Sequence, residues 1–360
     1  MKVTFYLADQ NPQRDRSLGI TAYSDGLIRS LAGKRALELA AVTSPGSYRP
    51  PAGVEVHRLP FSTSGGVGRF LSDNLHPLLC QVETDIWHYP KGYLPTVCRY
   101  RKPAVGTVHD LILQHYADHY PEDRSPLAYT YWKEVLRRSI PRFDLILTVS
   151  RTSEWAIRAF CDRYRLRCPP IRVTYEGFQI GKPPLAVTRK EDFVIHLASR
   201  ELHKRTRTLL EFWEQLATVG NHLPRLKLIG SLRVSDRKLA TSLPGVEVCG
   251  RLPRSELDVE ISQARALIFP SEVEGFGLPA AEAYALRTPV VYVSGTAVEE
   301  VLGEKAPGGF LLSEVETFRL ALQAVLALSP AAIEERAAEI TRRFAWANCA
   351  AATIAAYQEL

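Results

Sequence analysis

The sequence predicts an α/β protein made of two Rossmann-like domains of similar size, whose sheets face each other across a cleft. Its 360 residues exceed the length of one ordinary domain. Short β-rich runs alternate with helical stretches, which indicates parallel sheets covered on both faces. The alternation restarts after residues 179–192, "QIGKPPLAVTRKED", a linker-like segment with adjacent prolines and a glycine. Two such sheets place ligands beyond the carboxyl ends of their strands.

The predicted strands fall in both halves of the chain. In the first half they cover residues 2–8, 38–43, 54–59, 85–90, 104–110, 145–150 and 171–177. In the second half they cover residues 192–199, 225–231, 246–252, 266–271, 289–294 and 308–313.

Helical segments are expected between these strands. Residues 206–217, "TRTLLEFWEQLA", carry an apolar stripe at helical spacing. The predicted domains are residues 1–182 and 183–340. Residues 341–360 are expected to form a terminal helix that packs back on the first domain.

Composition indicates a soluble globular protein, with 46% hydrophobic and 23% charged residues. No apolar run is long enough to span a bilayer. The N-terminus "MKVTFYLADQ" has no long apolar region and no cleavage site, so we expect a cytoplasmic protein. The six cysteines are scattered without a C-x-x-C pair, which favours reduced, mostly buried thiols.

The charge is uneven along the chain. Residues 1–182 carry 25 basic and 17 acidic residues, a net +8, whereas residues 183–360 carry 20 and 22, a net −2. A basic half suggests an acidic partner, either nucleic acid, a phosphorylated substrate or an anionic membrane surface. A solvated surface with a basic bias is the alternative.

The stretch "FPSEVEGFGLPAAEA" (269–283) has the pattern of a strand end, a glycine loop and a helix start. Gly275 and Gly277 allow a ligand to approach the backbone, and Pro279 suits the first helical turn. Helix N-termini favour anionic or hydroxyl-rich ligands. Glu274 in the loop and Glu282 in the helix are acceptors for sugar hydroxyls. An ordinary strand–helix turn is the alternative interpretation.

A basic segment follows the strand predicted at 192–199. Arg200 and Lys204 stand between that strand and the next helix, where two cations can neutralise a diphosphate. Arg205 is a further candidate, and plain surface charge is the alternative.

Other motifs are weaker. Residues 64–70, "SGGVGRF", lack the full dinucleotide fingerprint, so we expect a mobile loop. His115 and His119 have a metal-ligand spacing, but their neighbours favour a loop. No D-x-D and no P-loop lysine motif occurs in the chain.

Several segments, in order along the chain, resemble family 4 glycosyltransferases, which are retaining enzymes of the GT-B fold. One of these segments is "PSEVEGFGLPAAEAYALRTPVV", which resembles the family signature of two glutamates separated by seven residues. The other segments are residues 85–97, 105–112, 147–157, 196–213, 293–304 and 342–350. The overall look is most similar to bacterial mannosyltransferases of polysaccharide assembly.

The resemblance implies that the domain of residues 1–182 binds the acceptor and that the domain of residues 183–340 binds the nucleotide sugar. It also implies roles for particular residues. Glu282 would accept hydrogen bonds from the ribose hydroxyls. Arg200 and Lys204 would stabilise the diphosphate. His109 would lie beside the transferred sugar. Glu274 would contact the sugar and is not expected to act as a nucleophile. The implied catalytic residues are His109, Glu274, Arg200 and Lys204. The implied donor-binding residues are Gly19, Gly275, Phe276, Gly277, Leu278, Glu282, Gly250 and Arg251.

The resemblance implies a substrate class as well. The donor would be a nucleotide sugar, GDP-mannose first and a UDP-hexose second, used without a metal or other cofactor. The acceptor would be a saccharide or lipid-linked saccharide at the inner membrane face, and nucleic acid is not expected. A GT-B nucleotide-sugar epimerase or a non-catalytic sugar-binding protein are the alternatives.

Overall fold

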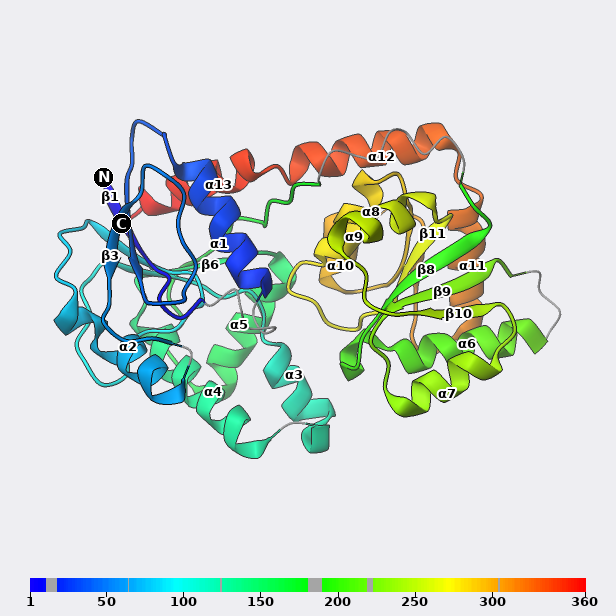
Figure 1. Ribbon diagram of the computed structural model, residues 1–360, viewed down its shortest axis with the longest axis horizontal. Helices are drawn as coiled ribbons and strands as arrows, with labels where there is room; N and C mark the ends of the chain where they lie inside the picture. The colour runs from blue at the N-terminus through cyan, green and yellow to red at the C-terminus, as the bar shows by residue number, and fades with distance from the viewer. Residues whose placement is uncertain (11–17, 64, 124, 181–189, 219–222, 304) are drawn as a thin grey trace. The chain divides into compact units, whose positions relative to one another are not determined.

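The computed structural model describes residues 1–10, 18–63, 65–123, 125–180, 190–218, 223–303 and 305–360. The chain divides into two compact units, one made of residues 1–177 and 344–360 and the other of residues 178–343 (Figure 1). The boundary predicted between residues 182 and 183 lies outside the described residues. We describe each unit by itself.

The first unit contains a parallel sheet, with strands in the order β3-β2-β1-β4-β5-β6-β7 over the described residues. Its strands are β1 (Lys2–Tyr6), β2 (Glu38–Thr43), β3 (Glu55–Arg58), β4 (Ile86–Tyr89), β5 (Ala104–Thr107), β6 (Leu145–Thr148) and β7 (Ile171–Val173). Strands β4, β5 and β6 have four residues each, and all of these residues are buried, as expected for strands covered on both faces.

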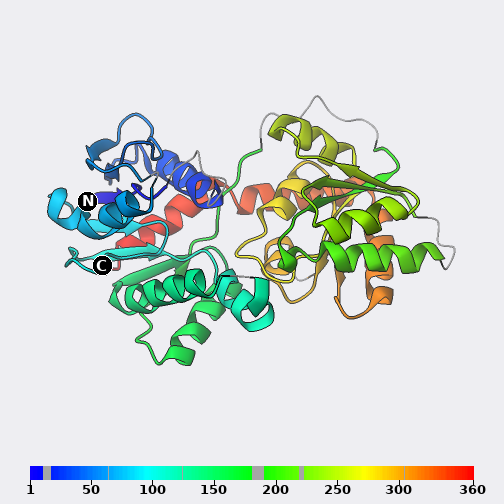
Figure 2. The same ribbon diagram turned by 60° about the horizontal axis from the view of Figure 1, so that its bottom comes forward.

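Helices cover the two faces of this sheet (Figure 2). They are α1 (Leu18–Leu31), α2 (Gly66–Leu79), α3 (Ile112–His119), α4 (Pro126–Ser139), α5 (Arg151–Tyr164) and α13 (Trp346–Tyr357), with short 3₁₀ turns η1 (Pro121–Asp123) and η2 (Ile140–Arg142). The start of α5 is fixed by the Ser150 hydroxyl, which accepts a hydrogen bond from the Ser153 amide.

Two predictions of loops in this unit are wrong. The segment predicted as a mobile loop at 64–70 enters helix α2 at Gly66. Buried Asn74 explains the helix, because its Oδ1 accepts from the Thr96 amide at 2.8 Å, a tertiary contact that outweighs the glycines. The segment around His115 and His119 is helix α3, and their ring centroids lie 4.4 Å apart, one turn from each other.

The last helix, α13, packs against α1. The Trp346 ring fills the space beside Gly26, where a Cβ atom would come within 2.2 Å of the indole. At the other end of α13, Tyr357 Oη lies 2.6 Å from Nδ1 of buried His88 in β4. Residues far apart in sequence therefore complete one core.

The second unit also contains a parallel sheet, with strands in the order β10-β9-β8-β11-β12-β13 over the described residues. Its strands are β8 (Phe193–Ala198), β9 (Arg225–Gly230), β10 (Val246–Cys249), β11 (Ala266–Phe269), β12 (Val290–Val293) and β13 (Gly309–Phe310).

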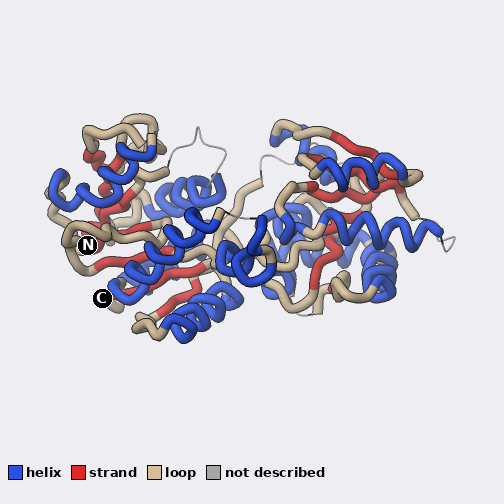
Figure 3. The backbone as a smooth tube through the Cα atoms, turned by 90° about the horizontal axis from the view of Figure 1, so that it is seen from below, coloured by secondary structure: helices blue, strands red, loops and turns tan. Residues whose placement is uncertain are grey.

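The helical segments of this unit lie on both sides of its strands (Figure 3). They are η3 (Leu202–Lys204), α6 (Thr206–Thr218), α7 (Val234–Ser242), α8 (Arg254–Gln263), α9 (Leu278–Ala285), α10 (Ala297–Leu302), α11 (Val315–Leu326) and α12 (Pro330–Arg343). The helix predicted at 206–217 is confirmed as α6. Its Phe212 packs against Phe318, with ring centroids 5.7 Å apart, and burying such a side chain stabilises the fold by roughly 1.5–3 kcal/mol.

The predicted α/β class with two parallel sheets is confirmed. How the two sheets face each other stays a prediction. Among the described residues, no helix is long and apolar enough to cross a membrane.

Candidate functional site

The candidate site of the second unit lies at the carboxyl edge of its sheet, where ligands of parallel sheets bind. The loops after β8, β9, β10 and β11 meet there, because these strands are neighbours. The Gly230 amide donates to the Gly250 carbonyl at 3.2 Å, and the Ser231 amide donates to the Ala198 carbonyl at 3.2 Å. Gly230 has φ +129°, and a Cβ there would lie 2.2 Å from the Ala198 oxygen, so only glycine fits.

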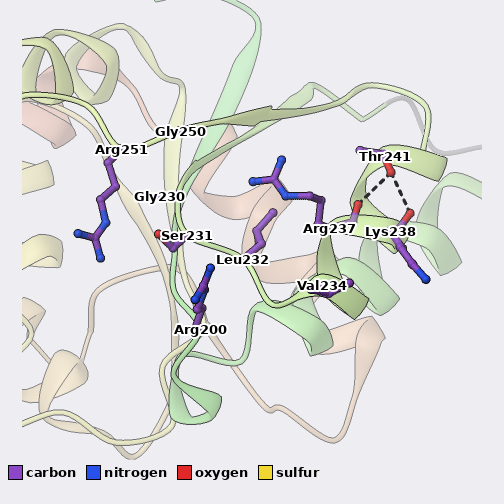
Figure 4. A pocket seen from close by; sticks show the side chains of 10 residues that line it. All are labelled: Arg200, Gly230, Ser231, Leu232, Val234, Arg237, Lys238, Thr241, Gly250 and Arg251. Carbon is purple, nitrogen blue, oxygen red and sulfur yellow. Dashed lines mark hydrogen bonds between the residues drawn. The ribbon is translucent and has the colours of Figure 1, made fainter.

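A pocket of about 640 Å³ opens among these loops and helix α7 (Figure 4). Its lining residues are Arg200, Gly230, Ser231, Leu232, Val234, Arg237, Lys238, Thr241, Gly250 and Arg251. The pocket therefore brings together Arg200, predicted from sequence as a catalytic residue, and Gly250 and Arg251, predicted as donor-binding residues.

The pocket carries a positive charge that its own lining does not neutralise. Arg200, Arg237, Lys238 and Arg251 are exposed, and the lining contains no carboxylate. Within the described ranges, these four side chains make no ion pair. Arg233 orders the Arg200 loop, because its Nε donates to the Arg200 carbonyl at 2.7 Å. Unpaired cations beside a backbone-lined pocket suit a phosphate-bearing ligand.

Beside this pocket, ion pairs hold the loop after β8 to the loop after β11. The Lys204 ammonium donates to Oε1 of Glu274, whose side chain is only 11% exposed. Arg205 Nε donates to Glu272 Oε2 at 2.7 Å. Lys204 Nζ also stands 5.1 Å from the centroid of the Phe269 ring. The predicted cation pair is thus divided: Arg200 lines the pocket, and Lys204 holds Glu274.

The strand–glycine loop–helix arrangement predicted for residues 269–283 is confirmed. Strand β11 ends at Phe269, and Gly277, with φ +93°, precedes helix α9. A Cβ on Gly277 would lie 2.8 Å from Val298 Cγ2, so both the dihedral angle and the space require glycine. Pro279 stands in the first turn, as expected. Gly275 and Phe276 are buried.

Glu282, on helix α9, is held by Arg254 at the start of α8. Arg254 Nη2 lies 2.9 Å from Glu282 Oε1, and its Nε donates to Asp258 Oδ1 at 2.8 Å. The Glu282 side chain is 16% exposed, whereas that of Arg254 is 53% exposed. Burial raises the pKa of Glu282, and the ion pair with Arg254 opposes that shift. Arg254 therefore favours the charged form of this carboxylate, against the effect of burial.

Two of the predicted site residues, His109 and Gly19, belong to the first unit. His109 lies two residues beyond the end of β5, and its Nε2 is 3.0 Å from the Pro90 carbonyl. A carbonyl can only accept, so Nε2 carries the proton and Nδ1 is the accepting nitrogen. Burial lowers the pKa of His109 to about 4, so the imidazole is neutral at pH 7. Gly19 is exposed and is the second residue of α1.

Sequence reasoning missed Arg254, Arg237 and Lys238. Arg254 follows Arg251 by three residues in "GRLPR", a signal that the sequence did contain. Arg237 and Lys238 reach the pocket only because α7 folds beside Gly230 and Gly250. In the described part of the chain, no three His, Cys, Asp or Glu side chains gather as a metal-binding set.

Comparison with known protein sequences finds glycosyltransferases. Residues 179–342 match the family described as Glycosyl transferases group 1. The O-antigen chain mannosyltransferase B of Escherichia coli is 27% identical over 293 residues, which cover 76% of this chain and 74% of that protein. The O-antigen chain mannosyltransferase RfbU of Salmonella typhimurium is 27% identical over 202 residues, 54% of this chain and 53% of that protein.

Solved structures agree with the predicted GT-B fold. Sucrose-phosphate synthase from Thermosynechococcus elongatus superposes with a TM-score of 0.72 at 16% identity, covering 100% of this chain and 98% of that one. WaaG, a glycosyltransferase involved in lipopolysaccharide biosynthesis, superposes with a TM-score of 0.68 at 15% identity. The superposition covers 98% of this chain and 99% of that one. At such identities the likeness concerns the fold.

Proposed function

We propose, from the premise that this chain is a glycosyltransferase with a group 1 domain over residues 179–342, that it transfers mannose from GDP-mannose to a saccharide acceptor. The observation that carries the donor sugar is the alignment with an O-antigen chain mannosyltransferase over 76% of the chain. The acceptor in this proposal is a saccharide or lipid-linked saccharide of surface-polysaccharide synthesis.

The cation-lined pocket supports binding of a nucleoside diphosphate. Arg200 and Arg251 can each donate two hydrogen bonds to phosphate oxygens, and Arg237 and Lys238 add positive charge. Because these groups neutralise the diphosphate, no metal ion is required in this proposal. Donor turnover is therefore expected to persist in excess EDTA.

The paired acidic residues support binding of the two sugars of the donor. Glu282, which is paired with Arg254, would be the acceptor for the ribose hydroxyls. Glu274 would hold the transferred hexose, and its partner Lys204 would sit next to the departing phosphate. Stabilising negative charge on a leaving group lowers the barrier, because that charge develops in the transition state.

The neutral His109 supports a role in sugar recognition. With Nε2 donating to Pro90, Nδ1 can accept a hydrogen bond from a hydroxyl of the transferred hexose. An uncharged imidazole also avoids repelling an oxocarbenium-like transition state.

The reaction proposed is a front-face substitution with retained configuration. The bond between the anomeric carbon and the phosphate oxygen breaks, and the acceptor oxygen bonds to the same face of that carbon. The acceptor proton passes to the leaving phosphate oxygen. No pair of carboxylates of the glycosidase type is then needed.

A nucleotide-sugar screen tests this function. We expect GDP-mannose to raise the melting temperature most, because a ligand that binds only the native state stabilises it. A larger shift with a UDP-hexose would replace the donor assignment. Absence of any shift with GDP-, UDP-, ADP- and dTDP-sugars would overturn nucleotide-sugar binding altogether. Turnover of the donor without any acceptor sugar, to an isomer, would favour an epimerase.

We also propose peripheral contact with an anionic membrane. The net charge of +8 over residues 1–182 supports it, as do the exposed apolar side chains of Val67 on α2 and Leu127 on α4. We expect vesicles containing phosphatidylglycerol to retain the protein at low salt and to release it at high salt. Equal retention on neutral phosphatidylcholine vesicles, or none on either, would contradict the proposal.

A further inference from the structure

A polar cluster lies at the carboxyl edge of the sheet in the first unit. We call Asp9, Asp73, Arg69 and Lys91 the Asp9 cluster. Strands β1 and β4 are neighbours that end at Tyr6 and Tyr89, so Asp9 and Lys91 follow two adjacent strand ends. Asp73 and Arg69 come from helix α2. This edge is where parallel sheets bind ligands.

The turn after β4 fixes Lys91. The Gly92 amide donates to the Tyr89 carbonyl at 2.9 Å, and Gly92 has φ +70°. A Cβ there would lie 2.9 Å from Val108 Cγ2, so the turn requires glycine. Lys91 Nζ is placed 3.7 Å from Asp9 Oδ2 and 5.7 Å from the centroid of the Tyr93 ring.

Asp9 is buried and incompletely satisfied. Its side chain is 4% exposed, and over the residues that the structure describes Oδ1 has no hydrogen-bond partner. A buried carboxylate oxygen without a partner costs about 1–3 kcal/mol or more. A fold that keeps such an atom at a strand end points to a ligand that donates to it.

Asp73 brings a second carboxylate to the same place. Tyr6 Oη donates to Asp73 Oδ1 at 2.9 Å, and Arg69 Nε lies 3.5 Å from Asp73 Oδ2. Burial, and next the charge of Asp9, raise the pKa of Asp73 to about 6. A carboxylate whose charge is disfavoured by burial and by a second carboxylate is a feature of functional sites more than of structural cores.

We propose that the Asp9 cluster binds the hydroxyl groups of a neutral hexose, the terminal residue of the acceptor. Asp9 Oδ1 accepts from one sugar hydroxyl, and Lys91 and Arg69 donate to sugar oxygens. Tyr131, whose side chain is 58% exposed and which feels the charges of Asp73 and Arg69, offers a ring face for the pyranose. The inference rests on the proposed function, which requires an acceptor site.

The mixed charge of the cluster favours a sugar over ions. A divalent cation would face the ammonium of Lys91 and the guanidinium of Arg69. A phosphate would face the carboxylates of Asp9 and Asp73. A neutral polyol both donates and accepts, so it can satisfy all four groups.

Saturation-transfer NMR with free glycosides tests the site in the full chain. The probes are the methyl α-glycosides of mannose, glucose, galactose and N-acetylglucosamine, with GDP as the reference ligand. We expect at least one glycoside to give a signal with the wild type. Asp9→Asn should lower that signal at least tenfold and leave the GDP signal unchanged. Tyr131→Ala, at an exposed position that folding tolerates, should lower it about threefold.

Asp85→Asn is the matched control, because exposed Asp85 precedes β4 at the opposite edge of the same sheet and accepts from the Lys2 amide. Its glycoside signal should equal that of the wild type. The proposal is overturned if no glycoside binds, if Asp9→Asn retains the signal, or if inorganic phosphate displaces the glycoside. Failure of GDP and UDP to bind the wild type would instead contradict the proposed function.

Discussion

The carboxyl edges of the two sheets differ in chemistry although their topology is alike. In the first unit, the edge holds the buried carboxylate of Asp9 and the partly buried carboxylate of Asp73, which accepts a hydrogen bond from Tyr6. In the second unit, the edge presents Arg200, Arg251 and other cations around a pocket. The first edge suits groups that donate hydrogen bonds, and the second suits phosphate oxygens.

The comparison teaches that parallel sheets provide the position of a site and loops provide its chemistry. In both units the side chains proposed to bind ligands stand two or three residues after a strand end: Asp9 after β1, Lys91 after β4, Arg200 after β8 and Arg251 after β10. The proposed division between hydroxyl binding in the first unit and diphosphate binding in the second rests on which side chains occupy those positions.

The largest effect is expected from removing the paired cation of the second edge. Lys204→Met deprives the departing phosphate of positive charge and leaves Glu274 without its partner. We expect kcat/KM for the donor to fall about 10²–10³-fold, as when one group that stabilises transition-state charge is lost. Steady-state kinetics measures this. Lys227→Met is the control, since Lys227 pairs with Glu260 at 2.8 Å on strand β9; a similar loss there would contradict the assignment.

A smaller effect is expected on the stability of the protein, through Asp73 at the carboxyl edge of the first sheet. The pKa of Asp73 rises from 3.8 to about 6 on folding, so the folded state binds that proton more tightly than the unfolded state. The free energy of unfolding should therefore decrease as the pH rises from about 4 to about 6, by on the order of 2 kcal/mol.

Urea unfolding of the wild type and Asp73→Asn at pH 4.5 and pH 7 measures this slope. The variant should lose it, whereas Asp85→Asn should keep it. Equal slopes in the wild type and Asp73→Asn would show that folding does not raise the pKa of Asp73.

The unpaired cations of the second edge should contribute to nucleotide affinity. Arg251→Ala is expected to weaken GDP binding about tenfold, which corresponds to ~1.4 kcal/mol, and to reduce its salt dependence. Calorimetry at two salt concentrations measures both. Arg265→Ala is the control, because Arg265 pairs with Asp192 at the amino edge of the same sheet at 2.8 Å. Unchanged GDP affinity in Arg251→Ala would contradict the donor pocket.

The smallest effect is a change in pH dependence. Arg254→Gln removes the cation that opposes the raised pKa of Glu282, so that pKa should rise further. Because the charged carboxylate is the hydroxyl acceptor, GDP binding should then fail at a higher pH than in the wild type. Asp258→Asn should lower the pKa of Glu282, because it removes a nearby negative charge. GDP binding by that variant should then persist to a lower pH than in the wild type. Parallel pH profiles in all three proteins would exclude a positioning role for Arg254.

The sequence predicted much of the fold and part of the site. The strand runs agree with the observed strands within a few residues, because buried parallel strands are short apolar runs with clear ends. The loop from Phe269 to Gly277 was predictable for the same reason. The start of α2 and the segment of α3 around His115 and His119 were predicted as loops. In α2, the contact of Asn74 with Thr96 is a tertiary interaction that local preference does not encode.

By itself, the sequence determined the α/β class, the strand ends and the residues that follow them, since periodicity and glycine positions are local properties. Only the tertiary structure decided which charges meet. It pairs Lys204 with Glu274 and Arg254 with Glu282. It also places Arg200 and Arg251 in a pocket whose lining contains no carboxylate. It also placed Asp9 beside Lys91, 82 positions apart in sequence. Such pairings depend on strand order and loop closure, which no local pattern encodes.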